Sequence, residues 1–308
     1  MSFCRARRSA LVPGALALAL SLPVVAEAQS SFDDAIRQFA ETQVRGYAQP
    51  LADALVANLS SGYFYTGAPR NRLGFSLEGV AMGTTITDKM RTYEARTPEG
   101  FDPQTFDAPT VFGGKGTTVN HATIPGLSYR SSDGVLDSKM FPTAVPQVRV
   151  SGLLNSEVVV RFFESGWLGG AYPKEDLPKL SMFGVGVRHA LNPYLGDLGM
   201  DIAISGSYNT MTFGENVEVK GTTFGANVGK GFGLINVMGG IESSGGTMNL
   251  AYTSESEDSP GTVNVDLESK RQIRFTAGAM LDLPILKLFG TAGFGEFTTY
   301  SAGVRVGF

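Results

Sequence analysis

The sequence is nearly free of cysteine: its 308 residues include one, Cys4, in the apolar stretch at the N-terminus. That stretch has the features of a signal peptide, so we expect Cys4 to be removed with it. The mature chain would then have no disulfide, thiol nucleophile, thiolate metal site or lipid anchor. A closed ladder of β-strands is one way for an exported chain to be stable without disulfides.

Long apolar runs are absent beyond residue 28, so no single helix of residues 29–308 is expected to cross a bilayer. Charged residues make up 18% of the chain and hydrophobic residues 43%, with 39 glycines. This composition excludes a disordered chain and a helical membrane protein. Two classes remain, a soluble all-β domain and a β-barrel whose apolar residues are spaced two apart.

Positive charge and histidine are scarce as well. Removal of residues 1–28, which hold three Arg and one Glu, changes the formal charge from −4 to −6. Because nucleic-acid binders carry a basic face, we expect no nucleic-acid partner. The sequence places no serine and no clustered carboxylates beside His121 or His189. We therefore expect no catalytic residue, no metal site and no cofactor, and hence no enzyme.

The N-terminus predicts export. Arg5, Arg7 and Arg8 form a basic region, residues 10–25 form an apolar core, and Ala26-Glu27-Ala28 puts small residues at the cleavage positions. We expect residues 1–28 to be a cleaved signal peptide. The alternative is a membrane anchor, for which the stretch is short.

Residues 29–66 have a helical pattern. Ser31 is a candidate cap for a first helix with apolar residues at helical spacing, and Pro50 is a good first residue for a second one. We predict two short amphipathic helices on the periplasmic side of the molecule. They either pack on an apolar surface or form a plug or gate under a barrel.

From Leu73 onward the apolar period changes to two. Leu73, Phe75 and Leu77, for example, alternate with small and polar residues, and similar runs recur to the end of the chain. The runs are about nine or more residues long, which is enough to cross a bilayer at a tilt and longer than most globular strands. Residues 67–308 are therefore predicted to form an all-β fold, a transmembrane antiparallel β-barrel of about 10–14 strands.

The predicted connections alternate in length. Asn155-Ser156 and Leu283-Pro284-Ile285 give short links on one side, and residues 87–145 and 165–177 give long ones on the other. Short inner turns and long outer loops are typical of outer-membrane barrels. The count is ten strands, and a hairpin within residues 60–72 or 106–145 would raise it to twelve or fourteen.

Charged residues recur on the inward face of the predicted strands. They are candidate lumen-lining residues: Glu78, Arg149, Arg161, Arg188, Asp201, Arg274, Asp282 and Arg305. In one interpretation they pair across neighbouring strands and fill the lumen. In the other they line a pore whose basic excess favours anionic or amphipathic solutes.

Two predicted outer loops carry features of their own. Residues 87–145 contain Phe101, Phe106, Phe112 and Phe141, which either form an entry site for a hydrophobic small molecule or pack the loop against the rim. The acidic residues Glu255, Glu257 and Asp258 form a solvated loop or hold a divalent cation between lipopolysaccharide molecules.

The last nine residues, 300–308, resemble the C-terminal signal by which outer-membrane barrels are recognised for assembly, with Tyr300, Gly303, Val304, Val306 and Phe308 as its residues. The resemblance implies the bacterial outer membrane as location. Its implied partners are membrane lipid, lipopolysaccharide and the barrel assembly machinery.

Segments 58–64, 108–113, 146–150 and 184–189 resemble an uncharacterised outer-membrane barrel family whose layout is similar to the FadL-type long-chain fatty-acid transporters. The resemblance carries over no binding residue. We expect passive passage of small or hydrophobic solutes. The alternative is a closed structural or surface-interaction barrel without transport.

Overall fold

The computed structural model describes residues 41–69, 72–168, 179–254 and 261–307. The predicted signal peptide, the first predicted helix near Ser31, the acidic loop at 255–260 and Phe308 lie outside the described residues.

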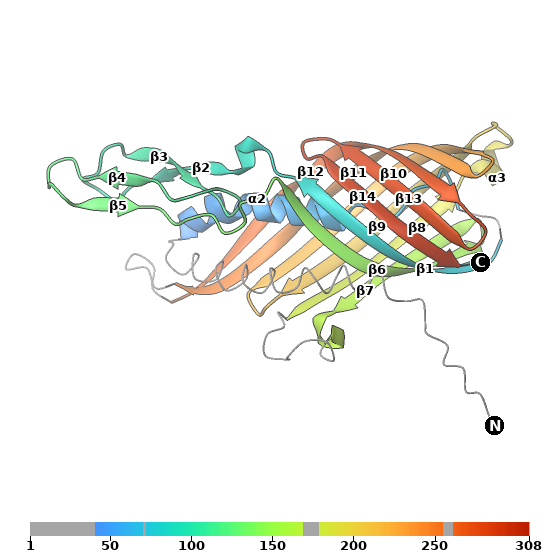
Figure 1. Ribbon diagram of the computed structural model, residues 1–308, viewed down its shortest axis with the longest axis horizontal. Helices are drawn as coiled ribbons and strands as arrows, with labels where there is room; N and C mark the ends of the chain where they lie inside the picture. The colour runs from blue at the N-terminus through green and yellow to red at the C-terminus, as the bar shows by residue number, and fades with distance from the viewer. Residues whose placement is uncertain (1–40, 70–71, 169–178, 255–260, 308) are drawn as a thin grey trace, which may run out of the picture.

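Among the described residues, ten antiparallel strands form one closed barrel, in which each strand pairs with its neighbours in sequence and the first barrel strand closes against the last (Figure 1). The predicted fold class is confirmed. The barrel strands are β1 (Gly74–Thr85), β6 (Met140–Leu153), β7 (Ser156–Glu164), β8 (Leu180–Ala190), β9 (Asp201–Phe213), β10 (Val217–Phe232), β11 (Ile235–Ser254), β12 (Gly261–Asp282), β13 (Leu286–Phe294) and β14 (Thr299–Gly307).

The outer face of the barrel is apolar because the period-two pattern puts large hydrophobic side chains outward. Phe224, Ile273 and Phe275 are each 62% exposed, and many other outward residues are exposed as well. A continuous apolar face of this kind in water would be an aggregation surface, whereas a bilayer matches it. Closure leaves no unpaired strand edge in the hydrocarbon. Among the described residues, no helix combines the length and the hydropathy needed to span a membrane.

The two ends of the barrel differ as predicted. At the short-turn end, β6 and β7 are joined by Leu154 and Asn155, both with positive φ, as tight hairpins require. The link 191–200 with the short helix α3 (Asn192–Leu195) is the exception. The opposite, long-loop end carries residues 86–139 and the segment after β7, which begins with the 3-10 helix η2 (Ser165–Leu168).

Residues 86–139 form an extension that projects from the long-loop end (Figure 1). After the 3-10 helix η1 (Asp88–Met90), strands β2 (Thr92–Arg96) and β3 (Thr105–Pro109) make one small sheet, and β4 (Thr118–Asn120) and β5 (Ser128–Arg130) make another. These hairpins do not join the barrel, so the barrel has ten strands among the described residues. Phe101 and Phe106 each contact Tyr129 within the extension, whereas Phe112 packs on Phe141.

The N-terminal segment differs from the prediction in two ways. Within residues 41–69, the helix α2 (Glu41–Leu59) continues through Pro50, where we expected a new helix to begin. Side chains on both sides of Pro50, including Tyr47 and Leu51, are buried, and this packing outweighs the hydrogen bond that proline removes.

The position of α2 also differs. We expected the helical segment at the short-turn end, but α2 begins at the long-loop end and runs into the lumen (Figure 1). There the Tyr47 hydroxyl donates to the Asp133 carbonyl, and the Val111 N–H donates to the Tyr47 carbonyl. Burial raises the pKa of the Tyr47 hydroxyl well above its usual range, and Tyr93 and Asp133 add to the effect.

Candidate functional site

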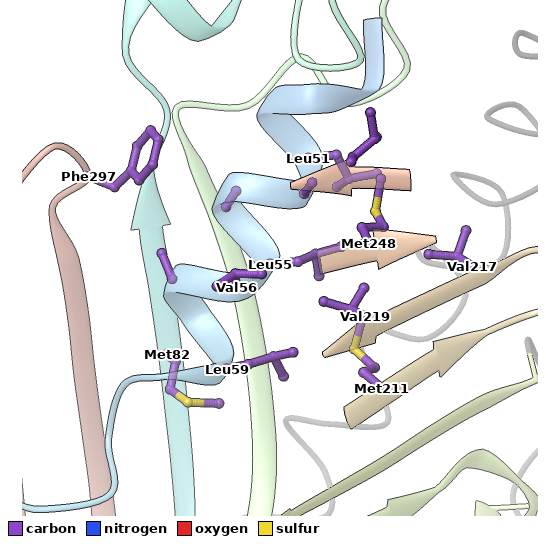
Figure 2. Close-up of a cluster of buried hydrophobic side chains, with 14 of the residues drawn as sticks. Leu51, Leu55, Val56, Leu59, Met82, Met211, Val217, Val219, Met248 and Phe297 are labelled. Atoms are coloured by element: carbon purple, nitrogen blue, oxygen red, sulfur yellow. The ribbon is translucent and has the colours of Figure 1, made fainter. Parts of the chain in front are cut away.

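The site is the interface between the barrel wall and residues 41–69, which we name the plug. In the half of the lumen nearer the long-loop end, α2 packs apolar side chains against apolar side chains of the wall (Figure 2). Leu51, Leu55 and Leu59 are buried there with wall residues such as Val219 and Met248. Each large side chain that is fully buried contributes about 1.5–3 kcal/mol, so apolar burial holds this half of the plug.

Glycines of the wall make room for the plug. A Cβ added at Gly184 would lie 2.3 Å from the Tyr63 hydroxyl, and one at Gly186 would lie 2.5 Å from the Tyr63 ring. A Cβ at Gly246 would lie 3.0 Å from Val56. The inner face of the wall is therefore complementary in shape to the plug. The side chains of the wall alone do not fill the lumen.

The C-terminal end of α2 is capped by arginines of the wall. The last carbonyls of a helix lack partners within the helix and carry partial negative charge. Arg161 donates to the carbonyls of Leu59 (3.1 Å) and Ser61 (2.6 Å). Arg274 donates to the carbonyl of Ala57 (3.3 Å). The last turn of α2 has no basic residue of its own, so the wall supplies the cations.

Beyond the helix, three aromatic residues of the plug meet three wall arginines. The guanidinium carbons of Arg161, Arg149 and Arg188 lie 3.5, 4.8 and 5.0 Å from the ring centroids of Tyr63, Tyr65 and Phe64, respectively. The Tyr65 hydroxyl also donates to Glu78 at 2.7 Å. Cation–π contacts of this kind are strongest where water is excluded, as it is here.

Ion pairs connect Arg149, Arg188 and Arg305 into one buried layer, and Arg161 joins it through Gln147, which bonds Glu78. Arg149 contacts Glu78 and Glu157, both at 2.6 Å, and Arg188 contacts Glu157 at 2.6 Å. Arg305 lies 3.7 Å from Glu78. We name the set Glu78, Arg149, Glu157, Arg161, Arg188 and Arg305 the arginine layer.

The arginine layer carries an excess of positive charge. Its four guanidinium groups face two carboxylates among the described residues, which leaves a net charge of +2. Arg149 and Arg188 offset part of the excess by donating to plug carbonyls, those of Tyr63 (2.6 Å) and Thr66, respectively. Buried charges are tolerated only with such partners, so the plug is part of what makes the layer stable.

The eight predicted lumen residues fall into three groups. The structure brings Glu78, Arg149, Arg161, Arg188 and Arg305 together in the arginine layer. Arg274 pairs instead with Glu242 at 2.7 Å, nearer the long-loop end. Asp282 pairs with Lys287, and Asp201 is exposed at the start of β9, so neither belongs to the layer.

Sequence reasoning missed Glu157, Gln147, Tyr63 and Tyr65. Glu157 could have been found, because counting back in twos from Arg161 puts it on the inner face. Gln147 accepts from Arg161 at 2.8 Å and donates to Glu78, and it is found by the same count from Arg149. The tyrosines had no such signal, since they belong to the plug.

The residues of the predicted assembly signal lie in β14, apart from Phe308. Tyr300, Val304 and Val306 point outward and are 43–49% exposed. Gly303 faces the lumen, where a Cβ would lie 2.3 Å from Phe289, the residue that stacks on Tyr65.

A serine does lie beside His189, contrary to expectation. The Ser156 hydroxyl is 2.8 Å from Nδ1 of His189, and the Tyr194 hydroxyl is 3.1 Å from Nε2. The described partners of the imidazole thus include no carboxylate that would orient it as the base of a hydrolase. The pair lies at the short-turn end, away from the arginine layer.

Comparison with solved structures finds several β-barrels with low similarity. OmpT, an outer membrane protein of Vibrio cholerae, has 7% identity, covers 77% of this chain and 100% of its own, and gives a TM-score of 0.25. The transport unit of the autotransporter AIDA-I from Escherichia coli has 9% identity, with 88% and 100% covered and a TM-score of 0.29. A mutant of TodX, a monoaromatic hydrocarbon channel, has 9% identity, with 88% and 98% covered and a TM-score of 0.28.

Comparison with curated proteins gives no match. Comparison with family models does: residues 8–308 match a family described as "Family of unknown function (DUF6588)". The match covers nearly the whole sequence, and the chain is a member of this family.

Proposed function

We propose that this protein is an outer-membrane barrel through which small solutes cross passively, and that the plug controls their passage. The observation that carries the proposal is the content of the lumen. A separate segment of chain fills it, and glycines such as Gly184 and Gly186 shape the wall around that segment. A barrel built only to be closed could be filled by its own side chains.

The apolar outer face and the closed strand ladder support a location in the outer membrane, with the long-loop end outside the cell. Membrane lipid and lipopolysaccharide would surround the barrel. The outward side chains Tyr300, Val304 and Val306 of β14 would be available to the assembly machinery.

Proteoliposome swelling tests the proposal. Refolded full-length mature protein is reconstituted and exposed to an iso-osmotic series of neutral, anionic and hydrophobic small solutes. Swelling that is faster than in empty liposomes is the expected result for at least one class. Folding is checked by the heat-dependent shift in gel mobility that closed barrels show. If the folded protein lets no solute through, the proposal of passage is wrong.

The second candidate is a closed barrel that strengthens the envelope. The observation in its favour is that all four guanidinium groups of the arginine layer have carboxylate or carbonyl partners. In that case the swelling assay is negative for every solute class, and loss of the protein weakens the cell against detergent. The protein is not proposed to be an enzyme.

A further inference from the structure

The first half of α2 lies beside a tall section of the wall that covers one side of it. Within the described chain, β13 pairs with β12 no further than Phe275, so the part of β12 before Phe275 has β11 alone as its neighbour in the sheet. There Arg45 donates to the Asp266 carbonyl at 2.7 Å, and Gln49 donates to the Glu268 carbonyl at 3.0 Å. The wall therefore holds this half of α2 without enclosing it.

The extension covers another side of the same half of α2. The Val111 N–H donates to the Tyr47 carbonyl, and the Tyr47 hydroxyl donates to the Asp133 carbonyl, both at 3.1 Å. Gln43 donates to the Tyr129 hydroxyl, also at 3.1 Å. The start of the plug thus lies between the extension and the tall strands β11 and β12 (Figure 1).

Side-chain packing between the extension and α2 is equally close. A Cβ added at Gly46 would be 2.2 Å from the Tyr93 ring, so this ring lies directly on the helix backbone. Val111 and Phe112 are fully buried, in the same apolar cluster as Tyr47. Because separation would return this apolar surface to water, the extension stabilises α2 in its place.

The parts of the extension that contact α2 are bonded to one another. The N–H groups of Val135 and Leu136 donate to the Val111 carbonyl at 2.9 and 2.7 Å, and the Gly134 N–H donates to the Gly114 carbonyl at 2.7 Å. The segments that hold Tyr47 from two positions are therefore one unit, and we expect them to move together.

The base of the extension is narrow. The chain enters it after β1 and leaves it before β6, and the Ile86 N–H donates to the Lys139 carbonyl at 2.9 Å at this base. Strands β2 to β5 pair with one another and with no barrel strand. Turning of the extension about its base would break side-chain contacts such as that between Phe112 and Phe141, but no bond of the barrel ladder.

We infer that the extension is the latch of the plug: α2 leaves its place only after the extension has turned away from it. The latch lies at the long-loop end, so the event that opens the plug acts from that end, which is the cell exterior in the proposed orientation. The inference rests on the proposed control of passage by the plug and adds how that control is regulated.

The latch and the arginine layer hold opposite ends of α2. Gly46 and Leu59 are about 20 Å apart along the helix, at about 1.5 Å per residue. Near the arginine layer, the Ser60 N–H donates to the Val56 carbonyl at 3.2 Å, and the Ser61 N–H donates to the Asn58 carbonyl at 3.0 Å. Hydrogen exchange of these two amides therefore reports motion of the whole plug when a change is made at the latch.

Loosening the latch is the first test. Tyr93→Ala removes the ring that lies on Gly46. Phe101→Ala is the matched control, because the described ring contacts of Phe101 lie within the extension. Exchange of residues 57–63 in the refolded mature protein should be at least tenfold faster with Tyr93→Ala and should change less than twofold with Phe101→Ala. Equal rates in the two variants would overturn the inference.

Tyr47→Phe is a milder variant, because it removes one hydroxyl and keeps the ring. The lost bond is the one to the Asp133 carbonyl, and exchange of residues 57–63 should be at least threefold faster. If Tyr93→Ala does not fold, this variant decides: a rate equal to that of the unchanged protein contradicts the latch.

A disulfide between α2 and the extension tests whether they must separate. Tyr93 Cγ is 2.9 Å from the Cβ position of residue 46, so Gly46→Cys and Tyr93→Cys place two Cβ atoms within the roughly 4.5 Å that a disulfide allows. Cys4, in the predicted signal peptide, is the only other cysteine in the sequence. Exchange of residues 57–63 should be at least tenfold slower in the oxidised than in the reduced double variant. Equal rates would show that plug and extension move as one body, which also overturns the inference.

Proteoliposome swelling separates the latch from the proposed passage. Solutes should enter faster with Tyr93→Ala than with the unchanged protein, and more slowly with the oxidised double variant. Faster exchange in Tyr93→Ala without solute entry in any variant would support the latch and contradict passage. Solute entry at one rate in all variants, with exchange unchanged, would support passage and overturn the latch.

Discussion

At the scale of single residues, Arg149 is the centre of the arginine layer, because it bonds both carboxylates and a carbonyl of the plug. Replacing it by methionine leaves the buried carboxylates of Glu78 and Glu157 with one fewer positive charge beside them. Breaking a buried pair by removing one partner costs about 3–5 kcal/mol. We expect Arg149→Met to lower the urea midpoint of barrel unfolding, followed by gel mobility and circular dichroism.

Lys179→Met is the control for Arg149→Met. Lys179 pairs with Glu215 on the exposed rim, where both side chains are in solvent, so its loss should leave the midpoint unchanged. Equal shifts in the two variants would mean that the buried ion pairs contribute no more than exposed ones.

Arg161 differs from Arg149 because its described hydrogen bonds go to plug carbonyls and to Gln147, and none goes to a carboxylate. Arg161→Gln therefore loosens the plug without isolating a buried acid. Hydrogen bonds from charged donors contribute about 1.5–3 kcal/mol each, so the plug should open at least tenfold more often.

Maleimide labelling of a cysteine in place of Ser61, which is buried in the plug, measures this opening. Labelling should be at least tenfold faster with Arg161→Gln than without it. Arg91→Gln, in the extension, should leave the rate unchanged. An unchanged rate with Arg161→Gln would show that aromatic and apolar contacts alone hold the plug.

The wall residues of the arginine layer could be predicted from the sequence, but the plug residues that contact them could not. Arg149 and Arg188 alternate with apolar residues, so the period-two pattern identifies them as inward. Alternation predicts the face of the strand on which a residue lies, but not which residues of other segments it contacts. Tyr63 and Tyr65 belong to another segment, and their position depends on the space inside the closed barrel.

At the scale of elements, β12 shows why alternation cannot locate a bulge. Its large apolar residues other than Met280 stay at odd positions, yet Leu267 is buried in the lumen and Ile273 is 62% exposed outside. Because of the bulge between them, odd positions face the lumen before it and the outside after it. The lumen also changes, from apolar near the long-loop end to polar beyond the bulge, so apolar residues are needed at odd positions in both parts. The two reversals cancel in the sequence.

Pro50 gives a prediction for α2. A proline inside a helix removes one hydrogen bond and costs about 3 kcal/mol relative to alanine. Pro50→Ala should restore a bond from residue 50 to Gly46 and slow hydrogen exchange of the α2 amides severalfold. Ala52→Gly, on the same helix, should speed exchange. Faster exchange in Pro50→Ala would mean that packing of the proline ring stabilises α2 more than the missing bond would.

At the scale of the whole molecule, the barrel and the plug depend on each other. The period-two pattern and the loop lengths predicted the ten strands and the two ends, because both are properties of neighbouring strands. The entry of α2 from the long-loop end was not predictable in this way. It depends on the apolar inner face of the wall, which includes Val219 and Met248. Closure of the barrel turns this face into an enclosed apolar surface on which α2 packs.

Removing residues 29–66, which leaves only the last three residues of the plug, separates the two parts. The arginine layer then keeps its net charge of +2 but loses the plug carbonyls and aromatic rings that offset it. The wall should still close, since each strand retains its neighbours, but with a lower unfolding midpoint. We expect single-channel recordings of this variant to show a conductance well above that of the full chain and a preference for chloride over potassium. Arg305→Gln in the same deletion should reduce that preference, whereas Lys179→Gln at the rim should not. A folded deletion variant that prefers cations would show that the arginine layer does not line the opened lumen.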